Sequence, residues 1–360
     1  MNSRNQHRPS LLGCLPETIQ QAIAPFNQPR YRGKQIYKWM HLKNADSFLE
    51  MSDLPLTFRQ QLDVHFVIKT LRLVVRQVSR DGTEKYLWEL HDGLRVESVL
   101  IPDGPRVTLC ISSQVGCALD CRFCATGRMG FARNLTSGEI VEQVLRAQQL
   151  LGQRITNIVF MGMGEPFLNY PGVIQAARIL GDPEGLAIAN KRITISTSGV
   201  IPKIYQFARE KHPYGLAISL HAPNQALREQ IMPLAKKFPI DELLASARFY
   251  VAKHKRLRVT FEYVLLKGVN DEPAHARELV QILSPIRCKL NLIPYNDCGL
   301  GFQAPSEERI QKFLEPLLQA PFTVTVRRNR GNDIQAACGQ LYVRTEARKR
   351  SIVQPLASES

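Results

Sequence analysis

The chain has 360 residues and a mass of 40.8 kDa, with 44% hydrophobic and 22% charged residues. These values are typical of a globular protein with a large core, and they exclude wholesale disorder. Lys and Arg total 47 against 32 Asp and Glu, so the net charge of +15 favours a polyanionic partner, with nucleic acid first and an anionic membrane surface second.

The sequence contains no apolar stretch of the length needed to cross a bilayer. The polar start MNSRNQHRPS is not followed by the apolar core of a signal peptide, so we expect a cytoplasmic protein. Eight cysteines in such a chain indicate metal or redox chemistry rather than a disulfide scaffold.

Residues 1–75 are predicted to form a small, basic helical domain. A helical pattern in TIQQAIAPF breaks at Pro25, and YRGKQIYKWMHLKN carries Ile36, Trp39 and Met40 at helical spacing. A third helix, LTFRQQLDVHF, follows the turn Asp53-Leu54-Pro55. The second helix mixes Arg and Lys with Tyr and Trp, which suits RNA phosphates and stacked bases, so we expect this domain to bind RNA.

Residues 76–105 are predicted to form a β-hairpin linker region. The runs LRLVVRQVS, EKYLWELH and LRVESVLI are rich in β-formers and are separated by Asp81-Gly82 and Asp92-Gly93. Asp-Gly between two such runs is a strong hairpin signal.

Residues 106–345 alternate strand and helix patterns. This alternation predicts an α/β fold with a parallel sheet and crossover helices, arranged as an open or closed barrel. The strand candidates are VTLCISS, NIVFMGM, RITISTS, GLAISLH, RVTFEYVLL and KLNLIPY, and a last one is FTVTVRR. Helical patterns such as SGEIVEQVLRAQQLL and GVIQAARIL stand between them, and residues 346–360 are expected to be a basic, polar, mobile tail.

Cys117, Cys121 and Cys124 form a C-x3-C-x2-C motif directly after the first strand of this region. A structural zinc site usually needs four protein ligands in two pairs, and no second Cys or His pair stands nearby at matching spacing. A [4Fe–4S] cluster held by three thiolates fits the ligand count better, and zinc stays the alternative. The iron left open can bind a substrate, for which S-adenosylmethionine is the natural candidate.

The spacing of these cysteines after a first barrel strand resembles the radical-SAM superfamily. Further motifs resemble the RlmN/Cfr family of RNA methyltransferases over about residues 95–342, and YRGKQIYKWM resembles that family's N-terminal domain. The resemblance implies a partial (β/α)6 radical-SAM barrel in residues 106–345. The motifs are LCISSQVGCALDCRFCATG, FMGMGEPFLNY, ITISTSGV, ISLHAPN, NLIPYN and GNDIQAACGQL.

The candidate cofactor-binding residues follow predicted strands, where barrel sites gather. Gly162 and Gly164 allow a ligand to approach the backbone, and Glu165 can accept a hydrogen bond from the cofactor's ammonium group. Phe123 can pack beside the cluster or the adenine, or simply pack within its loop. By resemblance the further cofactor-binding residues are Ser196, Ser219, Leu220, His221 and Asn296, with Ser198 as the nearest rival of Ser196.

The resemblance also assigns two thiols outside the cluster. Cys338 is expected to be methylated by one S-adenosylmethionine, and a radical made from a second one then removes hydrogen from that S-methyl group. The resulting carbon radical adds to adenine, and Cys110 releases the product by forming a disulfide. Glu97 is expected to accept the ring proton, with Cys110 as a rival base. The remaining cysteines match no motif and are expected to be structural: Cys14, Cys288 and Cys298.

The expected reaction is methylation at C2 of an adenosine in 23S ribosomal RNA, tRNA or both. The target is expected to be an unstacked nucleotide, because a stacked base hides its ring carbon. The basic clusters KHKRLR (253–258), RRNR (327–330) and EARKR (346–350) support an RNA partner. We expect a monomer that receives electrons from a reductase or flavodoxin-type donor.

Two alternatives stay open at this point. One is methylation at C8, as in the resistance-type members of the family, although GEPFLNY is more similar to the C2 branch. The stretch YNDCGLGFQAPSEER departs from both patterns and leaves the choice of RNA open. The other alternative is a non-enzymatic RNA-binding protein with a structural metal, which explains the charge and three cysteines but not the two further ones.

Overall fold

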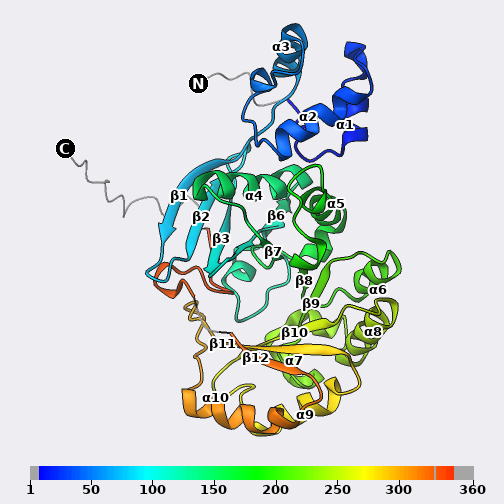
Figure 1. Cartoon of the computed structure of the whole chain (residues 1–360). Coiled ribbons are helices and arrows are strands. Elements are labelled where there is room, and N and C mark those ends of the chain that lie inside the picture. Colours follow the sequence, from blue (N-terminus) through cyan, green and yellow to red (C-terminus); the bar gives the residue numbers. More distant parts are fainter. Residues whose placement is uncertain (1–7, 328–329, 344–360) are drawn as a thin grey trace, which may run out of the picture.

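The computed structural model describes residues 8–327 and 330–343 (Figure 1). The N-terminal region is helical, as predicted: α1 (Pro16–Ala22), α2 (Tyr31–His41) and α3 (Leu56–His65) form the separate lobe at the top of Figure 1. The break expected at Pro25 is present, since a short 3-10 turn over Ala24–Phe26 follows α1. The expected tail at 346–360 and its cluster EARKR lie outside the described residues.

The main sheet has ten strands in the order β1-β2-β3-β4-β7-β8-β9-β10-β11-β12. From β4 to β12 every neighbouring pair is parallel, which confirms the predicted α/β fold, and the last predicted strand is present as β12. Because β1 and β12 remain unpaired edges in this order, the barrel is partial. The parallel strands are β4 (Arg106–Cys110), β7 (Asn157–Phe160), β8 (Ile193–Thr197), β9 (Gly215–Ser219), β10 (Val259–Leu265), β11 (Cys288–Pro294) and β12 (Thr323–Val326).

The predicted hairpins form β1 (Arg72–Val78), β2 (Glu84–Glu89) and β3 (Arg95–Asp103). Gly82 and Gly93 have φ angles of 80° and 79°, the left-handed conformation that the Asp-Gly turns require. These strands, expected as a linker region, pair antiparallel with one another and with β4, so they extend the main sheet. The pairing of β3 with β4 places Val99 opposite Cys110, a contact that the sequence pattern alone does not predict.

Helices connect the parallel strands. α4 begins with a capping box, in which the Thr136 hydroxyl accepts from the Glu139 N–H, and it ends at Gly152 with a φ of 69°. Its bounds, Ser137–Leu151, are those of the predicted pattern SGEIVEQVLRAQQLL. The other crossover helices are α5 (Tyr170–Gly181), α6 (Ile201–Arg209), α7 (Gln225–Ile231), α8 (Ile240–Lys253), α9 (Pro273–Leu283) and α10 (Glu307–Leu314).

A separate two-stranded sheet pairs β5 (Gln114–Gly116) with β6 (Phe131–Asn134), on either side of the cysteine motif. At this crossing a Cβ on Gly116 would lie 1.9 Å from the Gly130 carbonyl oxygen. The backbone of the two strands therefore meets too closely for any side chain at Gly116, and this closure fixes the base of the cysteine loop.

The C-terminal segment, Arg330–Val343, returns to the hairpin strands (Figure 1). The Ser79 hydroxyl donates to Asp333 at 2.6 Å, and the Gly331 N–H donates to Asp81 at 3.0 Å. The Arg330 guanidinium donates to the Pro102 carbonyl at 2.8 Å. Residues about 250 positions apart in the sequence are thus hydrogen-bonded, and the hairpins become the support of the segment that carries Cys338.

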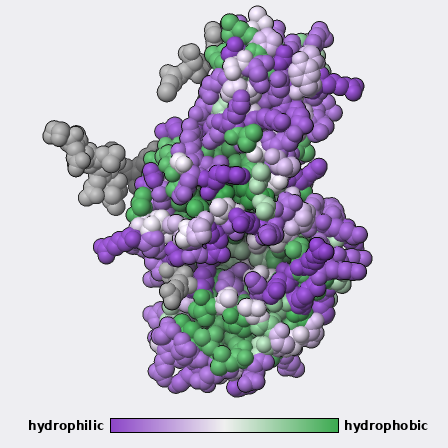
Figure 2. All heavy atoms as spheres, viewed as in Figure 1, coloured by the Kyte–Doolittle hydropathy of each residue, from purple (hydrophilic) through white to green (hydrophobic). Residues whose placement is uncertain are grey.

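Most of the visible surface is hydrophilic, with an apolar area in the lower half, near α10 (Figure 2). Leu318 is the most exposed large apolar side chain, at 80% of its surface, and it lies beside Val326 of β12. Within the described residues, no helix combines the length and the apolar character that a membrane span requires.

Candidate active site

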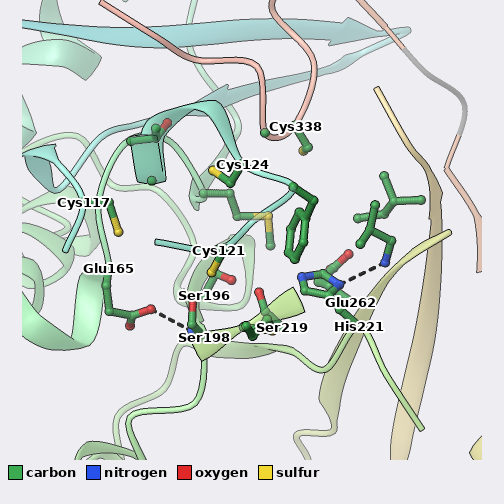
Figure 3. Close-up of a pocket in the computed structure, with 18 of the residues that line it drawn as sticks. Cys117, Cys121, Cys124, Glu165, Ser196, Ser198, Ser219, His221, Glu262 and Cys338 are labelled. Atoms are coloured by element: carbon green, nitrogen blue, oxygen red, sulfur yellow. Dashed lines mark hydrogen bonds between the residues drawn. The ribbon is translucent and has the colours of Figure 1, made fainter. Parts of the chain in front are cut away.

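A pocket of about 1010 Å³, partly open to solvent, lies at the carboxyl ends of the parallel strands. The three motif cysteines, Glu165 and Cys338 line it together with residues that end β8, β9 and β11 (Figure 3). The predicted residues that line it are Cys117, Cys121, Phe123, Cys124, Gly162, Gly164, Glu165, Ser196, Ser198, Ser219, His221, Asn296 and Cys338. The pocket therefore brings together side chains from positions 117 to 338, as the barrel topology predicts.

The cysteine loop is anchored at three places around its sulfur atoms. The Cys117 N–H donates to the Gly130 carbonyl at 2.8 Å, and the Arg122 N–H donates to the Ile231 carbonyl at 3.0 Å. The Ala125 N–H donates to the Gly339 carbonyl at 2.8 Å, which ties the loop to the C-terminal segment. The loop is therefore held in place by its own backbone before any metal binds.

The donor set fits an iron–sulfur cluster. Among the described residues, no three His, Cys, Asp or Glu side chains converge on a single metal ion. A four-iron cluster does not need such convergence, because each thiolate binds its own iron. Burial raises the pKa of Cys117 to about 12 and also raises the pKa values of Cys121 and Cys124, so the positive charge of bound iron would be what keeps these sulfurs ionised.

The turn after β7 requires its glycines. Gly164 has a φ of 97°, and a Cβ there would lie 2.5 Å from the Gln114 side chain. A Cβ on Gly162 would lie 2.7 Å from the Ile111 carbonyl. The close backbone approach leads directly to Glu165, whose carboxylate accepts from the backbone N–H groups of Phe167 at 2.9 Å and Ser198 at 2.7 Å (Figure 3).

Glu165 combines burial with fixed geometry. Burial raises its pKa, while the two N–H donors lower it. Its carboxylate lies at the pocket wall beside the cysteine loop, where a ligand ammonium group would supply the missing positive charge. This arrangement supports the expected contact with the amino group of S-adenosylmethionine.

His221 is held in one tautomer. Its Nδ1 accepts from the Val264 N–H at 2.9 Å, so the remaining proton sits on Nε2 (Figure 3). Burial, followed by the charge of Arg228, lowers the pKa of His221 to about 3. The ring is therefore neutral at physiological pH, and it meets the ring of Phe123 edge-on at 4.8 Å. Phe123 thus packs on the pocket wall rather than only within its loop.

Asn296 offers an open acceptor to a ligand. Its amide donates to the Cys338 carbonyl at 3.2 Å, while its buried Oδ1 has no hydrogen-bond partner among the described residues. A buried unpaired oxygen in a pocket fits a site that a polar ligand completes. Leu220 differs from the other predicted residues, because it is buried and does not line the pocket; its backbone N–H donates to the Glu262 carbonyl at 3.0 Å.

Arg228 is a site residue that the sequence analysis missed. It is fully buried, and its guanidinium donates to the carbonyls of Ser198 at 2.7 Å and Ser219 at 3.2 Å. Its Nε also donates to the Leu220 carbonyl at 3.2 Å. One cation therefore joins the ends of β8 and β9. The sequence signal, an Arg seven residues after His221 on an otherwise ordinary helix, is too weak to predict this role.

The two expected thiols line a smaller cavity of about 410 Å³, together with Met161, Arg327 and Gly339. Cys110 is buried at the end of β4, and Cys338 faces the main pocket (Figure 3). Both are reduced. Burial, and then the neighbouring Cys338 thiol, raise the pKa of Cys110 to about 12. The two thiols that the resemblance assigns are thus close neighbours.

Glu97 is engaged in structural contacts. Its carboxylate pairs with Lys85 at 3.2 Å and accepts from the Tyr342 N–H at 3.0 Å. It lines neither the main pocket nor the cavity between the two thiols. Since Tyr342 belongs to the C-terminal segment, Glu97 anchors the segment that carries Cys338. This geometry favours a positioning role over the expected contact with substrate.

Cys298 also lies closer to the site than expected. Its Sγ is 3.1 Å from the Asn296 carbonyl and 3.3 Å from the Gly339 carbonyl. Cys14 and Cys288 lie away from the pocket, in agreement with a structural role.

Comparisons with known proteins give two regional matches. Residues 111–280 match the radical SAM superfamily, and residues 10–68 match the N-terminal domain of ribosomal RNA large subunit methyltransferases. The first range contains the cysteine loop and β7 to β10, and the second contains the helical lobe.

Relatives match over nearly the whole chain. The dual-specificity RNA methyltransferase RlmN of Syntrophobacter fumaroxidans is 46% identical, covering 91% of this chain and 96% of the relative. The protein of the same name from Alcanivorax borkumensis is 44% identical, over 96% and 93% of the two chains. The crystal structure of a radical SAM methyltransferase from Sphaerobacter thermophilus superimposes with a TM-score of 0.88 at 45% identity, covering 92% of this chain and 99% of that one.

Proposed function

Because the chain belongs to the RlmN family of radical-SAM RNA methyltransferases, we propose that it methylates C2 of an adenosine in 23S ribosomal RNA and in tRNA through a methylated Cys338. The observation that carries the proposal is that Cys338 and the three motif cysteines line one pocket. Cys110 and Cys338 together line a second, smaller cavity. The dual specificity in the relatives' name supports both classes of RNA.

The enzyme uses a [4Fe–4S] cluster and S-adenosylmethionine. When bound, they supply a methyl cation equivalent and a 5′-deoxyadenosyl radical. We assign Cys117, Cys121 and Cys124 as the iron ligands. Glu165 and Asn296 provide polar contacts for the cofactor, and the other proposed contacts are Gly164, Ser196, Ser219, His221 and the backbone of Leu220.

The two thiols have different tasks in this proposal. Cys338 receives the methyl group on its sulfur and carries the methylene carbon to adenine, since an sp² ring carbon is not a nucleophile toward a sulfonium. Cys110 loses its proton and attacks the sulfur of the resulting RNA–Cys338 adduct. A disulfide forms as the bond between sulfur and the new carbon breaks, and that carbon keeps the electron pair of the bond and takes up a proton to become the methyl group. The burial that raises the pKa of Cys110 keeps it protonated until that step.

The rest of the proposal concerns partners. We propose that residues 1–75 are the RNA-binding accessory domain, 76–105 the β-rich extension, 106–345 the catalytic core and 346–360 a basic tail. In the helical lobe Tyr31 is exposed and Lys43 lies 3.5 Å above the ring of Trp39, which supports contact with bases and phosphates. We further propose a cytoplasmic monomer that takes electrons from a reductase or flavodoxin-type protein.

Mass spectrometry of nucleosides tests the function. Ribosomal RNA and tRNA that lack the modification are incubated with reconstituted enzyme, S-adenosylmethionine and a reductant. We expect 2-methyladenosine in both RNAs, identified against authentic standards. A product that co-migrates with 8-methyladenosine would overturn the assignment of C2, and the absence of any methylated adenosine from both RNAs would overturn the proposal.

The role of Cys110 has its own test. In Cys110→Ala the adduct cannot be cleaved by a disulfide, so a covalent protein–RNA complex through Cys338 is expected to accumulate. Cys14→Ala serves as the matched control, because this thiol lies outside the pocket. Normal turnover by Cys110→Ala without a crosslink contradicts this role.

A further inference from the structure

Arg327 is a partly buried cation that the proposed function leaves without a task. It directly follows β12, and its backbone N–H extends the parallel pairing by donating to the Leu292 carbonyl at 2.8 Å. This hydrogen bond fixes the backbone of Arg327, and its side chain extends from there to the main pocket. Its Nη1 lies 3.0 Å from Cys338 Sγ, within hydrogen-bonding reach.

The proposed function sets a chemical demand on Cys338. Transfer of a methyl group from a sulfonium requires a thiolate, because the protonated thiol is a poor nucleophile. The sulfur must also point at the methyl carbon when the transfer occurs. A guanidinium within 3.0 Å meets both demands, since it stays protonated and its N–H groups have a fixed direction.

We propose that Arg327 is a catalytic residue of the self-methylation step, holding Cys338 as a thiolate and aiming its sulfur into the main pocket. This inference rests on the proposed function. The Cys338 proton leaves to bulk water, and the Sγ lone pair forms a bond to the methyl carbon of S-adenosylmethionine. The bond between that carbon and the sulfonium sulfur breaks, which yields S-adenosylhomocysteine and an uncharged S-methyl-Cys338.

The neighbouring charges support this pairing. Glu262 of β10 lines the same pocket, but it accepts from Asn291 at 2.6 Å and burial raises its pKa, so it competes weakly for Arg327. Cys110 of β4 and Cys124 of the cysteine loop line the same cavity as Cys338, and burial raises the pKa of both, so in protein without the cluster these two thiols are protonated neighbours. The proximity of the Cys338 sulfur is the largest cause that raises the pKa of Arg327, which keeps the guanidinium charged.

A second cavity of about 1280 Å³, which Cys338 also lines, carries more basic than acidic side chains. Its charged lining residues besides Glu262 and Arg327 are Asp103, Arg106, Lys191, Arg192 and Arg330. Arg192, which precedes β8, provides a matched control, because Arg192→Met removes one cation from the same cavity without changing the group that contacts Cys338 Sγ.

The first experiment measures thiol reactivity in protein without cluster, cofactor or RNA. The rate of iodoacetamide alkylation at Cys338 is followed from pH 6 to pH 10 by peptide mass spectrometry for wild type, Arg327→Met, Arg327→Lys and Arg192→Met. At pH 7 we expect Arg327→Met to react about tenfold more slowly than wild type, because the guanidinium that contacts Cys338 Sγ is missing. Arg327→Lys should recover part of the rate, and Arg192→Met should behave like wild type.

The pH profile separates activation from a merely structural effect. Because ionisation of a thiol increases with pH, any effect of Arg327 on ionisation should shrink as the pH rises, and the rates of wild type and Arg327→Met should approach each other toward pH 10. Equal rates at pH 7, or a rate lowered by the same factor at every pH, would overturn the proposal, because the first shows no activation and the second shows only altered access.

The second experiment keeps the inference distinct from the function on which it rests. Reconstituted enzyme is mixed with S-adenosylmethionine and no RNA, and the S-methyl content of Cys338 is followed over time. Wild type should be methylated at least tenfold faster than Arg327→Met at equal iron content. Equal rates for the two would overturn the role of Arg327 alone, whereas absence of Cys338 methylation in wild type would overturn the proposed function.

Discussion

The cysteine loop and the C-terminal segment meet beside the pocket, where the Ala125 N–H donates to the Gly339 carbonyl, but they are built in different ways. The loop holds its three cysteines within eight residues, and β5 and β6 close it on either side. The segment around Cys338 is irregular, and the contacts that hold it come from the turn between β1 and β2, from β3, from the cysteine loop and from Arg327. One region is thus a local motif, and the other depends on distant parts of the chain.

This difference gives the hairpin strands β1 to β3 a structural role in holding the segment that carries Cys338. The barrel supplies the pocket, the proposed iron ligands and two contacts with Cys338, from Asn296 and Arg327, and the rest of the segment that carries Cys338 lies against a wall outside the barrel. β1 to β3 provide that wall through Asp81, Ser79 and Glu97, whose side chains bind the returning segment. We infer that the hairpins exist to place Cys338 against the cysteine loop.

The largest expected effect is complete loss of RNA methylation, and the iron content should distinguish a variant of the cysteine loop from a variant of the C-terminal segment. Cys121→Ala should lose the brown colour of an iron–sulfur protein, most of the bound iron and all RNA methylation, because an iron of the cluster loses its proposed ligand. Cys338→Ala should also lose all RNA methylation while it keeps its iron and colour, because its sulfur does not ligate the cluster. Iron analysis and absorption spectra of anaerobically purified proteins check this, and loss of iron in Cys338→Ala would show that the regions are not independent.

A large loss of stability is expected when Arg228, the cation that joins the ends of β8 and β9, is replaced. Arg228→Met leaves the carbonyls of Ser198, Ser219 and Leu220 without their donor. Because each unpaired buried acceptor costs about 1–3 kcal/mol, we expect the free energy of unfolding to fall by on the order of 3 kcal/mol. Urea denaturation measures this change.

Arg228→Lys is the control for charge. It keeps a cation but lacks the fork that reaches several carbonyls, so it should rescue only part of the stability. Binding of S-adenosylmethionine, measured by equilibrium dialysis, should weaken in both variants. Unchanged stability in Arg228→Met would show that the ends of β8 and β9 do not depend on this side chain.

A smaller effect is expected on the C-terminal segment. Glu97→Gln removes the charge that pairs with Lys85 and weakens the contact with Tyr342, so the free energy of unfolding should fall by about 1–2 kcal/mol. Limited proteolysis should cut the segment around Cys338 faster. Glu89→Gln is the matched control, since Glu89 lies on the neighbouring strand and pairs with Arg72 and Arg95 instead.

The same variant distinguishes positioning from proton transfer. If Glu97 positions the segment, Cys338 methylation without RNA should slow together with RNA methylation. If only RNA methylation is lost while Cys338 methylation continues at the wild-type rate, Glu97 accepts the ring proton, as the sequence pattern leads one to expect.

The last effect is a loss of stability in acid. The pKa of His221 is lowered to about 3, below its unfolded value of about 6.5, so only the unfolded chain takes up this proton between these pH values. The stabilising contribution is therefore complete above pH 6.5 and falls by about 1.4 kcal/mol per pH unit as the pH decreases toward 3. Denaturation of wild type and His221→Asn at pH 7 and pH 5 measures it.

Asparagine suits this comparison because it tolerates the left-handed backbone at this position, where φ is 58°. The difference in stability between wild type and His221→Asn should shrink from pH 7 to pH 5. A difference that stays constant over this range would contradict a neutral, buried His221.

Much of the fold was predictable, because its signals are local. The Asp-Gly turns, the capping box at Thr136 and the alternation of strands and helices all depend on residues a few positions apart, and each is present. The place of the hairpins was not predictable, since the pairing of β3 with β4 depends on the match of two strand edges rather than on either sequence.

The sequence by itself determined the nature of the chemistry. Three cysteines at iron-ligand spacing, Gly-Glu after a strand and a basic composition define which groups are available, and these follow from the residue types and their spacing. Only the tertiary structure decided how they are used. Arg327 reaches Cys338, Arg228 joins two strand ends, and Glu97 holds Tyr342 at 245 positions' separation, because each contact depends on where the folded sheet places the backbone.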